Sequence, residues 1–357
     1  MKTYIKFLIS LFTISFFKVF FIFFAIILIT NILEQIEFFK EIEFNIFSIA
    51  FLSFLNSPSI IFEILPFIFL ISTQIAFIKL IDKNELEIFK YIGLDNLKII
   101  KIVGIYSFTL GLLFVIFFYN FSSILKNSYL VIKNKYVDDG KYLAVINENG
   151  LWIKDEIDQT INIINANKVD DEFLLDVLIT QFDNSFNIVR TIQSEKINIS
   201  TLNWKVINPK ILENNILDTL DEIELRSNFD LKKINSLFSN LSSLSIINLI
   251  KLRKSYQSLN YSIIEIDAHL YKIITYPIYL TLISIFSAII MFNIRYQKNS
   301  IFKIIFGIFL SVIIYYINYF FNILGISEKI PLILSITFPL VILFIINIIS
   351  IVKLNEK

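Results

Sequence analysis

Six long apolar runs dominate this sequence of 357 residues and restrict what it can fold into. A helix rises about 1.5 Å per residue, so about 20 apolar residues cross the hydrocarbon core of a bilayer. Each run is long enough, and spans are expected at residues 11–33, 57–81, 98–121, 270–294, 301–323 and 330–352. Composition agrees, because 56% of the residues are hydrophobic, above the roughly 45–50% of soluble domains. The first run is too long for a secretory signal, and we expect it to be an uncleaved span.

Lysine and arginine residues gather on one side of these spans. That side holds Lys2, Lys6, Lys79, Lys83, Lys90, Lys98, Lys101, Arg295, Lys298, Lys303, Lys353 and Lys357. The short loops on the opposite side contain only Lys40 and Lys329. Because basic loops stay in the cytoplasm, the positive-inside rule places both termini there, together with the segment between the second and third spans.

The polar region between the third and fourth spans is then external, and its pattern is that of an all-β domain. Short alternating runs occur at residues 142–146, 151–154, 160–165, 174–182, 188–193, 196–199, 204–207 and 222–225. Turn sequences such as Glu148-Asn149-Gly150 separate them, which is typical of a sandwich or jelly roll. Residues 244–256 read as an amphipathic helix that leads back to the membrane.

The expected architecture is an α-helical membrane protein with six transmembrane helices, three on each side of an inserted all-β jelly-roll domain. Residues 1–121 would hold the first three spans, with a short helix at about 83–93. Residues 122–268 would hold the external β domain and its linker helix, and residues 269–357 the last three spans.

The charged segment 79–95 separates the second and third spans and is too short to fold alone. From Asn84 it is expected to form a small helix, because Leu86, Phe89 and Ile92 recur every third residue on one face. Gly93 is placed to end this helix and Asp95 to cap the next one. The segment is either a solvated connector or a docking site for a partner.

Motifs for catalysis are missing from the sequence. It has no phosphate-binding P-loop, no cysteine, and a single histidine, His269. A P-loop nucleotidase, a thiolate or histidine-paired metal site and a Ser-His-Asp triad are therefore disfavoured. His269 is expected to pack at the start of the fourth span. The formal net charge of +1 gives no reason to expect nucleic-acid binding. We expect a subunit that is not an enzyme and has no cofactor or metal, driven by a partner at the charged segment.

Several motifs, in order along nearly the whole chain, carry a family resemblance. They are Asn84-Glu85-Leu86 followed by Gly93, Gly150-Leu151-Trp152-Ile153-Lys154-Asp155, Asn203-Trp204, Leu244-Ser245-Ile246, Tyr276-Pro277, Phe306-Gly307-Ile308, Gly325-Ile326 with Pro331, and Pro339. Together with the topology they resemble the LptF/LptG family, the permease subunits of the ABC transporter that exports lipopolysaccharide. Within that family the Trp152 motif is closer to LptG than to LptF.

The resemblance implies a place in the bacterial inner membrane with the β domain in the periplasm. It implies an LptF-like permease as heterodimer partner, an LptB-like ATPase dimer in the cytoplasm, and LptC-like and LptA-like proteins in the periplasm. In the family the short cytoplasmic helix sits in a groove of the ATPase. Carried over, Glu85 would contact the ATPase, Leu86 and Phe89 would be apolar anchors, and Gly93 would form the turn.

The resemblance also implies that lipopolysaccharide enters from the outer leaflet and moves into the periplasmic domain. A groove there could involve Trp152 and be lined by Leu151, Ile153, Ile161 and Ile163, although these residues could equally form an ordinary sandwich core. The family tends to place basic residues at the outer end of the first span. This chain has Asn31, Glu34 and Glu37 there, and Lys40 is the cation available to lipid phosphates. The alternatives are an ABC permease for another lipid or lipoprotein, and a membrane scaffold whose periplasmic β domain binds a ligand.

Overall fold

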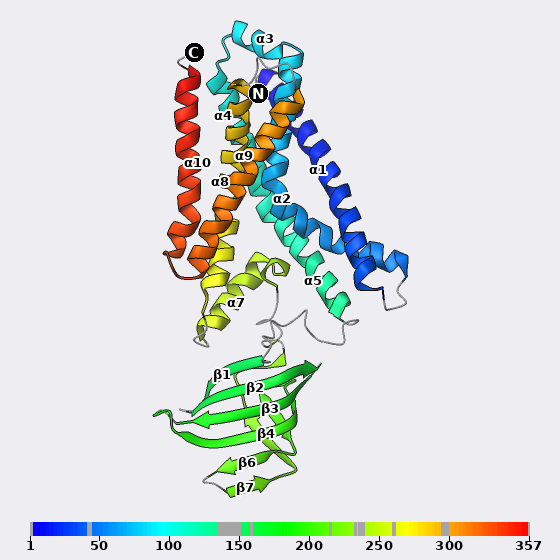
Figure 1. The fold of residues 1–357 in the computed structure, drawn as a ribbon, viewed down its shortest axis with the longest axis vertical. Helices are drawn as coiled ribbons and strands as arrows, with labels where there is room; N and C mark the ends of the chain where they lie inside the picture. Colours follow the sequence, from blue (N-terminus) through cyan, green and yellow to red (C-terminus); the bar gives the residue numbers. More distant parts are fainter. Residues whose placement is uncertain are drawn as a thin grey trace. The chain divides into compact units, whose positions relative to one another are not determined.

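The computed structural model divides the chain into two compact units (Figure 1). The helical unit comprises Met1–Lys126 and Ile264–Lys357, and the β unit comprises Asn127–Ile263. The residues that the structure describes are 3–40, 45–134, 151–157, 160–170, 172–183, 185–213, 216–231, 234, 240–258, 262–293 and 300–355. The predicted strand at 142–146 lies outside them.

Six described helices or helix runs are long and apolar enough to cross a membrane, as predicted. Their helices are α1 (Thr3–Phe38), α2 (Ile46–Asp82), α4 (Asn96–Leu113), α5 (Asn120–Asn134), α8 (Ile264–Asn293), α9 (Ser300–Ile326) and α10 (Leu332–Asn355). A π-helical turn at Phe114–Tyr119 joins α4 and α5 into the third span. The short helix α3 (Glu85–Tyr91) lies between the second and third spans.

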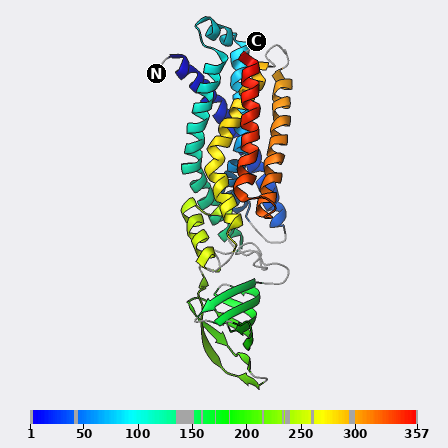
Figure 2. The ribbon, with the colours of Figure 1, turned by 90° about the vertical axis from the view of Figure 1, so that its left-hand side faces the viewer.

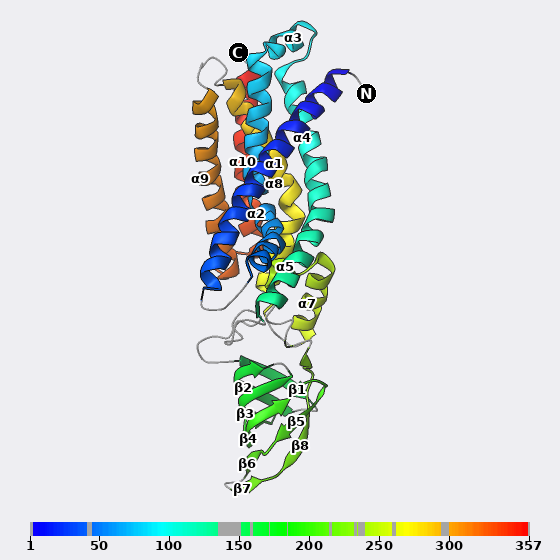
Figure 3. The ribbon, with the colours of Figure 1, turned by 90° about the vertical axis from the view of Figure 1, so that its right-hand side faces the viewer.

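Helices α2 and α8 form the centre of the helical unit, and α9 lies on its outside. In the most apolar stretch of each helix, 61% of the residues are buried in α2 and in α8, compared with 11% in α9. Figure 2 shows α10 (red) beside α8 and α9, and Figure 3 shows α1 (dark blue) alongside α2. The outer helices α1, α9 and α10 therefore present much of their apolar surface outward.

Contacts between the helices involve a glycine at a close approach and a backbone carbonyl that a proline leaves without its hydrogen bond. A Cβ atom built at Gly307 of α9 would lie 1.8 Å from Nε2 of Gln74 on α2, so the two helices approach closely there. Pro66 lacks the N–H that would bond the carbonyl of Phe62 four residues earlier. The hydroxyl of Tyr276 on α8 donates to that carbonyl instead. A neighbouring helix thus supplies the bond that the proline removes, as expected for prolines inside membrane spans.

His269 takes part in helix packing. Its Nε2 lies 2.9 Å from the hydroxyl of Tyr119, which belongs to the π-helical turn of the third span. This contact agrees with the packing role expected for the single histidine.

The described strands of the β unit form one antiparallel sheet, which confirms the inserted all-β domain. Its strands are β1 (Leu151–Ile157), β2 (Thr160–Asp170), β3 (Phe173–Phe182), β4 (Ile188–Asn198), β5 (Asn203–Ile207), β6 (Lys210–Glu213), β7 (Ile216–Thr219) and β8 (Glu222–Arg226). The order is β1-β2-β3-β4-β5-β8, and β6 pairs with both β4 and β7. The runs predicted at 188–193 and 196–199 form the single strand β4, and β6 and β7 were not predicted. The predicted linker helix is α7 (Ile246–Ser258).

Strand β4 divides the sheet, because its two ends have different partners. Arg190 to Gln193 pair with β6, whereas Lys196 to Asn198 pair with β5. The sheet is curved, as the ribbon in Figure 3 shows, and its inner side chains form an apolar core. Trp204 is fully buried in that core, and its indole Nε1 donates to the carbonyl of Phe229 at 2.6 Å. The segment after β8 is thereby held against the core.

Candidate functional site

Helix α3 is bounded by two residues with positive φ. Asn84 has φ 56° and Gly93 has φ 79°. The N–H of Asn84 donates to the carbonyl of Ile81 at 3.0 Å, and its own carbonyl accepts from Glu87 and Ile88. The same residue therefore ends α2 and begins α3, in a conformation that asparagine tolerates better than most residues.

Gly93 forms the predicted turn at the other end of α3. The N–H of Leu94 donates to the carbonyl of Phe89 at 2.9 Å, across the glycine. This bond and the apolar side chains of Phe89 and Leu94, which are both buried, are the features of a Schellman motif. The motif fixes where α3 ends.

Asp95 takes the predicted N-cap position of α4, but its side chain makes no capping hydrogen bond. Its carboxylate instead lies 3.3 Å from the ammonium of Lys98. That ammonium also donates to the carbonyl of Gly93 at 2.9 Å. Lys98 is thus placed beside the C-terminal end of α3, where a cation is favourable.

The inner face of α3 packs on the helical unit of the same chain. Leu86 is 5% exposed and Phe89 is 8% exposed. The ring of Phe89 meets the ring of Phe7 on α1 edge to face, with centroids 6.0 Å apart. Leu86 and Phe89, which were predicted as anchors for an ATPase, therefore hold α3 to its own chain.

Three apolar side chains on or just after α3 are exposed. Ile88 is 56% exposed, Tyr91 is 89% exposed and Ile92 is 61% exposed. The prediction that Ile92 shares a face with Leu86 and Phe89 was wrong, because α3 ends at Tyr91 and the chain turns at Gly93. Sequence reasoning missed this surface. Ile88 and Tyr91 each come two residues after a buried side chain, Leu86 and Phe89, and this spacing could have placed them on the opposite face of the helix.

Glu85 begins α3 and is partly buried. Its Oε2 atom is buried and has no hydrogen-bond partner within the described part of the chain. Glu87, two residues later, is exposed. Both carboxylates lie in the first turn of α3, where the helix dipole favours negative charge.

The residues predicted to line a lipid groove do not share one face of the sheet. Leu151 pairs with Ala166 and Ile153 with Ile164, on the side that faces the core. Trp152, which is 58% exposed, points to the other side. Ile163 pairs with Lys154, and Ile161 pairs with Glu156. Lys154 and Glu156 alternate along β1 with the inward-facing residues, so Ile161 and Ile163 lie on the same face as Trp152. Odd positions of β1 therefore share a face with even positions of β2, and the groove assumed the opposite register.

A row of polar side chains crosses the inner face at one end of the sheet. Asp155 pairs with Asn162, Asn162 with Gln181, and Gln181 with Arg190. Nε2 of Gln181 donates to Oδ1 of Asn162 at 2.6 Å, and Nε of Arg190 donates to Oε1 of Gln181. Sequence reasoning included Asp155 in a motif but gave it no role.

Asp155 is 1% exposed, and its carboxylate is fully used by the segment after β8. Oδ2 accepts from the hydroxyl of Ser227 at 2.7 Å and from the backbone N–H of Asn228 at 3.0 Å. Oδ1 accepts from the side-chain amide of Asn228 at 2.8 Å. This buried carboxylate therefore ties β1 to the end of β8.

Near the C-terminal end of α1, Glu34 and Glu37 are exposed on its last turns. Lys40 follows the helix and is also exposed. Asn31 is buried, and its amide donates to the hydroxyl of Ser57 on α2 at 3.1 Å. Asn31 thus joins α1 to α2 and is not available to a lipid headgroup. Within the described ranges, no three His, Cys, Asp or Glu residues gather as metal ligands.

Comparison with known families gives one clear relationship. Residues 6–353 match the family described as lipopolysaccharide export system permease LptF/LptG. No curated protein sequence matches the chain. The family match and the six apolar helices indicate a multi-pass inner-membrane permease subunit of a lipopolysaccharide export transporter. The chain therefore belongs to the LptF/LptG family.

Proposed function

We propose that this chain is the LptG-type subunit of the transporter and that it extracts lipopolysaccharide from the inner membrane. The observation that carries the proposal is the two-sided α3: Leu86 and Phe89 are buried in the chain, while Ile88, Tyr91 and Ile92 are exposed. An exposed aromatic and aliphatic cluster of this kind is typical of a partner site. The partner is an LptB-like ATPase dimer in the cytoplasm.

The construction of α3 allows it to transmit force. Its inner face is fixed by packing, and its ends are fixed at Asn84 and Gly93. A movement of the ATPase against the outer face would therefore shift α2 and α4 without unwinding α3. Glu85, partly buried in the first turn of α3, would contact the ATPase through the part of its side chain that remains exposed.

Lipid extraction explains why such force is needed. Exposing acyl chains to water costs about 0.8 kcal/mol per CH₂ group, so a lipid with several chains does not leave the bilayer unaided. The outward apolar surfaces of α1 and α9 suit a heterodimer with an LptF-like chain of the same architecture, with lipopolysaccharide entering between α1 and α9 helices. The β domain would lie in the periplasm and pass the lipid, with LptC-like help, to an LptA-like bridge.

The assignment to LptG in place of LptF rests on the motif from Gly150 to Asp155. Within it, Leu151 and Ile153 fill the core and Asp155 fixes the end of β8. Trp152 is left exposed on the outer face of the sheet. The tryptophan is therefore not required for the core, which is consistent with a contact to another subunit.

Affinity purification from native membranes tests the proposal. A tagged full-length chain is expected to bring down a P-loop ATPase. It is also expected to bring down a second six-span chain, in a one-to-one ratio with the tagged chain. The purified complex, placed in vesicles, is expected to release lipopolysaccharide to a soluble acceptor when ATP is supplied. A chain that purifies alone, with its β domain holding a periplasmic ligand, would be a scaffold and would contradict the proposal.

The change Lys40→Ala tests where the lipid first meets the chain. Lys40 is exposed after α1, and a lysine loses its attraction to a phosphate when the ammonium is removed. Crosslinking of lipopolysaccharide to a photoreactive residue at Leu33, which is 61% exposed, is expected to fall about fivefold. The matched change Lys329→Ala, in the turn after α9, is the control. An unchanged crosslinking yield would show that Lys40 does not contact the lipid.

A further inference from the structure

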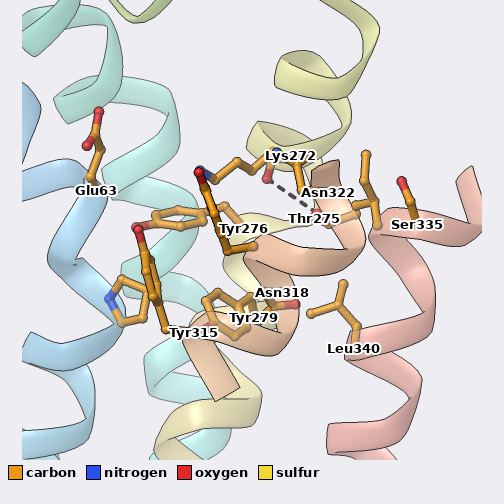
Figure 4. Close-up of a pocket in the computed structure, with 13 residues that line it drawn as sticks. Glu63, Lys272, Thr275, Tyr276, Tyr279, Tyr315, Asn318, Asn322, Ser335 and Leu340 are labelled. Carbon is orange, nitrogen blue, oxygen red and sulfur yellow. Dashed lines mark hydrogen bonds between the residues drawn. The ribbon is translucent and has the colours of Figure 1, made fainter. Parts of the chain in front are cut away.

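An open pocket of about 110 Å³ lies between α2, α8, α9 and α10 of the helical unit, and its lining side chains Glu63, Lys272, Tyr315 and Tyr319 are exposed. Figure 4 shows its side chains arriving from these four helices: Glu63 from α2, Lys272 and Tyr279 from α8, Tyr315 and Asn318 from α9, and Ser335 from α10. One water needs about 10–15 Å³ of such volume. The pocket therefore has room for several waters, or for a group the size of a phosphate or a sugar ring.

The pocket lies toward the ends of the helices that are expected to face outward. Lys272 is eight residues after the start of α8 at Ile264, about 12 Å along the helix. Ser335 is three residues after the start of α10 at Leu332, about 5 Å along that helix. Polar side chains at this depth face the headgroup half of the outer leaflet, if the β domain is periplasmic.

Charged groups in the pocket have unused hydrogen-bonding capacity. Within the described residues, neither the ammonium of Lys272 nor the carboxylate of Glu63 has a hydrogen bond or an ion pair. Glu63 is close enough to Lys126 on α5 for their charges to interact. The lining itself holds one cation, Lys272, and one anion, Glu63. Ionisable residues inside membrane helices are costly and usually mark a binding site or a pathway.

The remaining lining adds hydroxyl, amide and aromatic groups. Tyr315 and Tyr319 stack with their ring centroids 6.5 Å apart, and both expose part of their rings. Asn318 and Asn322, on the same side of α9, also line the pocket. Amides and phenols both donate and accept hydrogen bonds. Together with Lys272 and Glu63, these groups match a ligand that carries several hydroxyls and an anionic group.

We propose that this pocket binds the sugar headgroup of an outer-leaflet glycolipid, with an anionic group of the ligand at Lys272. The hydroxyls of the sugar would meet Glu63, Asn318 and the tyrosines. This inference rests on the proposed function and deepens it. Lys40 is the single described cation at the outer end of α1, and Lys272 supplies a second cation within one subunit. The headgroup site is thus built from α2, α8, α9 and α10.

Photocrosslinking of the full chain, with the subunits that co-purify, tests the proposal. Tyr315→p-benzoylphenylalanine puts the probe in the pocket, and Tyr316→p-benzoylphenylalanine puts it next in sequence at a 64% exposed position that does not line the pocket. The complex is placed in nanodiscs of phosphatidylglycerol with a small fraction of lipopolysaccharide. Position 315 is expected to give mainly glycolipid adducts and position 316 mainly phosphatidylglycerol adducts. The same adduct ratio at both positions would overturn the proposal, because the pocket would then sample bulk lipid.

The change Lys272→Gln is expected to lower the glycolipid adducts at position 315 about tenfold, which corresponds to one charge-assisted hydrogen bond. Lys272→Arg should retain most of them, and Lys329→Gln should retain all. Undiminished adducts in Lys272→Gln would overturn the role of Lys272. Failure here would leave ATPase co-purification and ATP-driven lipid release intact, whereas failure of the proposed function would remove both.

Discussion

Replacing both Tyr91 and Ile92 with alanine is expected to abolish co-purification of the ATPase while the chain still folds and inserts. The two side chains are 89% and 61% exposed, so they contribute little to the packing of α3. Buried in a partner groove, residues of this kind contribute about 2 kcal/mol each. Losing both corresponds to roughly a thousandfold weaker complex. Quantitative pull-down from membranes, normalised to the chain, measures the effect.

The control for this change is the pair Ile216→Ala and Leu217→Ala on β7, where both side chains are 63% exposed. These changes remove similar apolar surface from the β unit and should leave ATPase binding unaltered. Glu85→Lys is expected to act like the α3 double change, since it puts a cation where the ATPase contact is proposed. Retention of the ATPase within twofold in the α3 double variant would refute the docking surface.

The change Asp155→Ala is expected to lower the free energy of unfolding of the β unit by about 3 kcal/mol. The carboxylate accepts three hydrogen bonds from Ser227 and Asn228 and is 1% exposed. Its removal leaves buried donors without acceptors, which costs more than the bonds themselves contribute. Pulse proteolysis of the full chain in urea, following cleavage within the β unit, measures the change.

The control is Asp218→Ala on β7, an exposed aspartate that makes no such side-chain network with the described residues. It should change the free energy of unfolding by less than about 0.5 kcal/mol. Asp155→Asn is expected to have an intermediate effect on the free energy of unfolding. Its amide keeps one acceptor oxygen, but its NH₂ group would face donors of Ser227 or Asn228. If Asp155→Ala behaves like Asp218→Ala, the carboxylate does not hold β1 to the end of β8.

Length and hydrophobicity were enough to predict the membrane spans, because a bilayer tolerates few other arrangements of such runs. The all-β insert was also predictable from alternation, but β6 and β7 were missed. Each has four residues, which is too short for a periodic pattern to stand out from a turn-rich loop. Their pairing with β4 depends on contacts that no local pattern encodes.

Face assignments were less predictable than element positions. A spacing of three placed Ile92 with Leu86 and Phe89, but α3 is only seven residues long and ends before Ile92. The groove residues were chosen by parity within each strand. The face of one strand relative to the next depends on register, which is fixed by the pairing of Leu151 with Ala166.

The intramembrane pocket was only half visible in the sequence. It was not identified there, although Tyr315, Asn318, Tyr319 and Asn322 recur at helical spacing along the fifth span. Glu63 and Lys272 lie about 200 residues apart in sequence and on different helices. Only the packing of α9 against α2 and α8 brings these groups to one place.

Coupling to an ATPase requires α3 to be cytoplasmic, and the chain allows a direct measurement of its side because it contains no cysteine. Glu87→Cys puts a thiol at an exposed position of α3, and Ser185→Cys puts one at an exposed turn of the β unit. In intact spheroplasts an impermeant maleimide is expected to label position 185 and to leave position 87 unlabelled until the membrane is opened. Labelling of position 87 in intact spheroplasts would place α3 outside the cytoplasm and contradict the coupling of this chain to an ATPase.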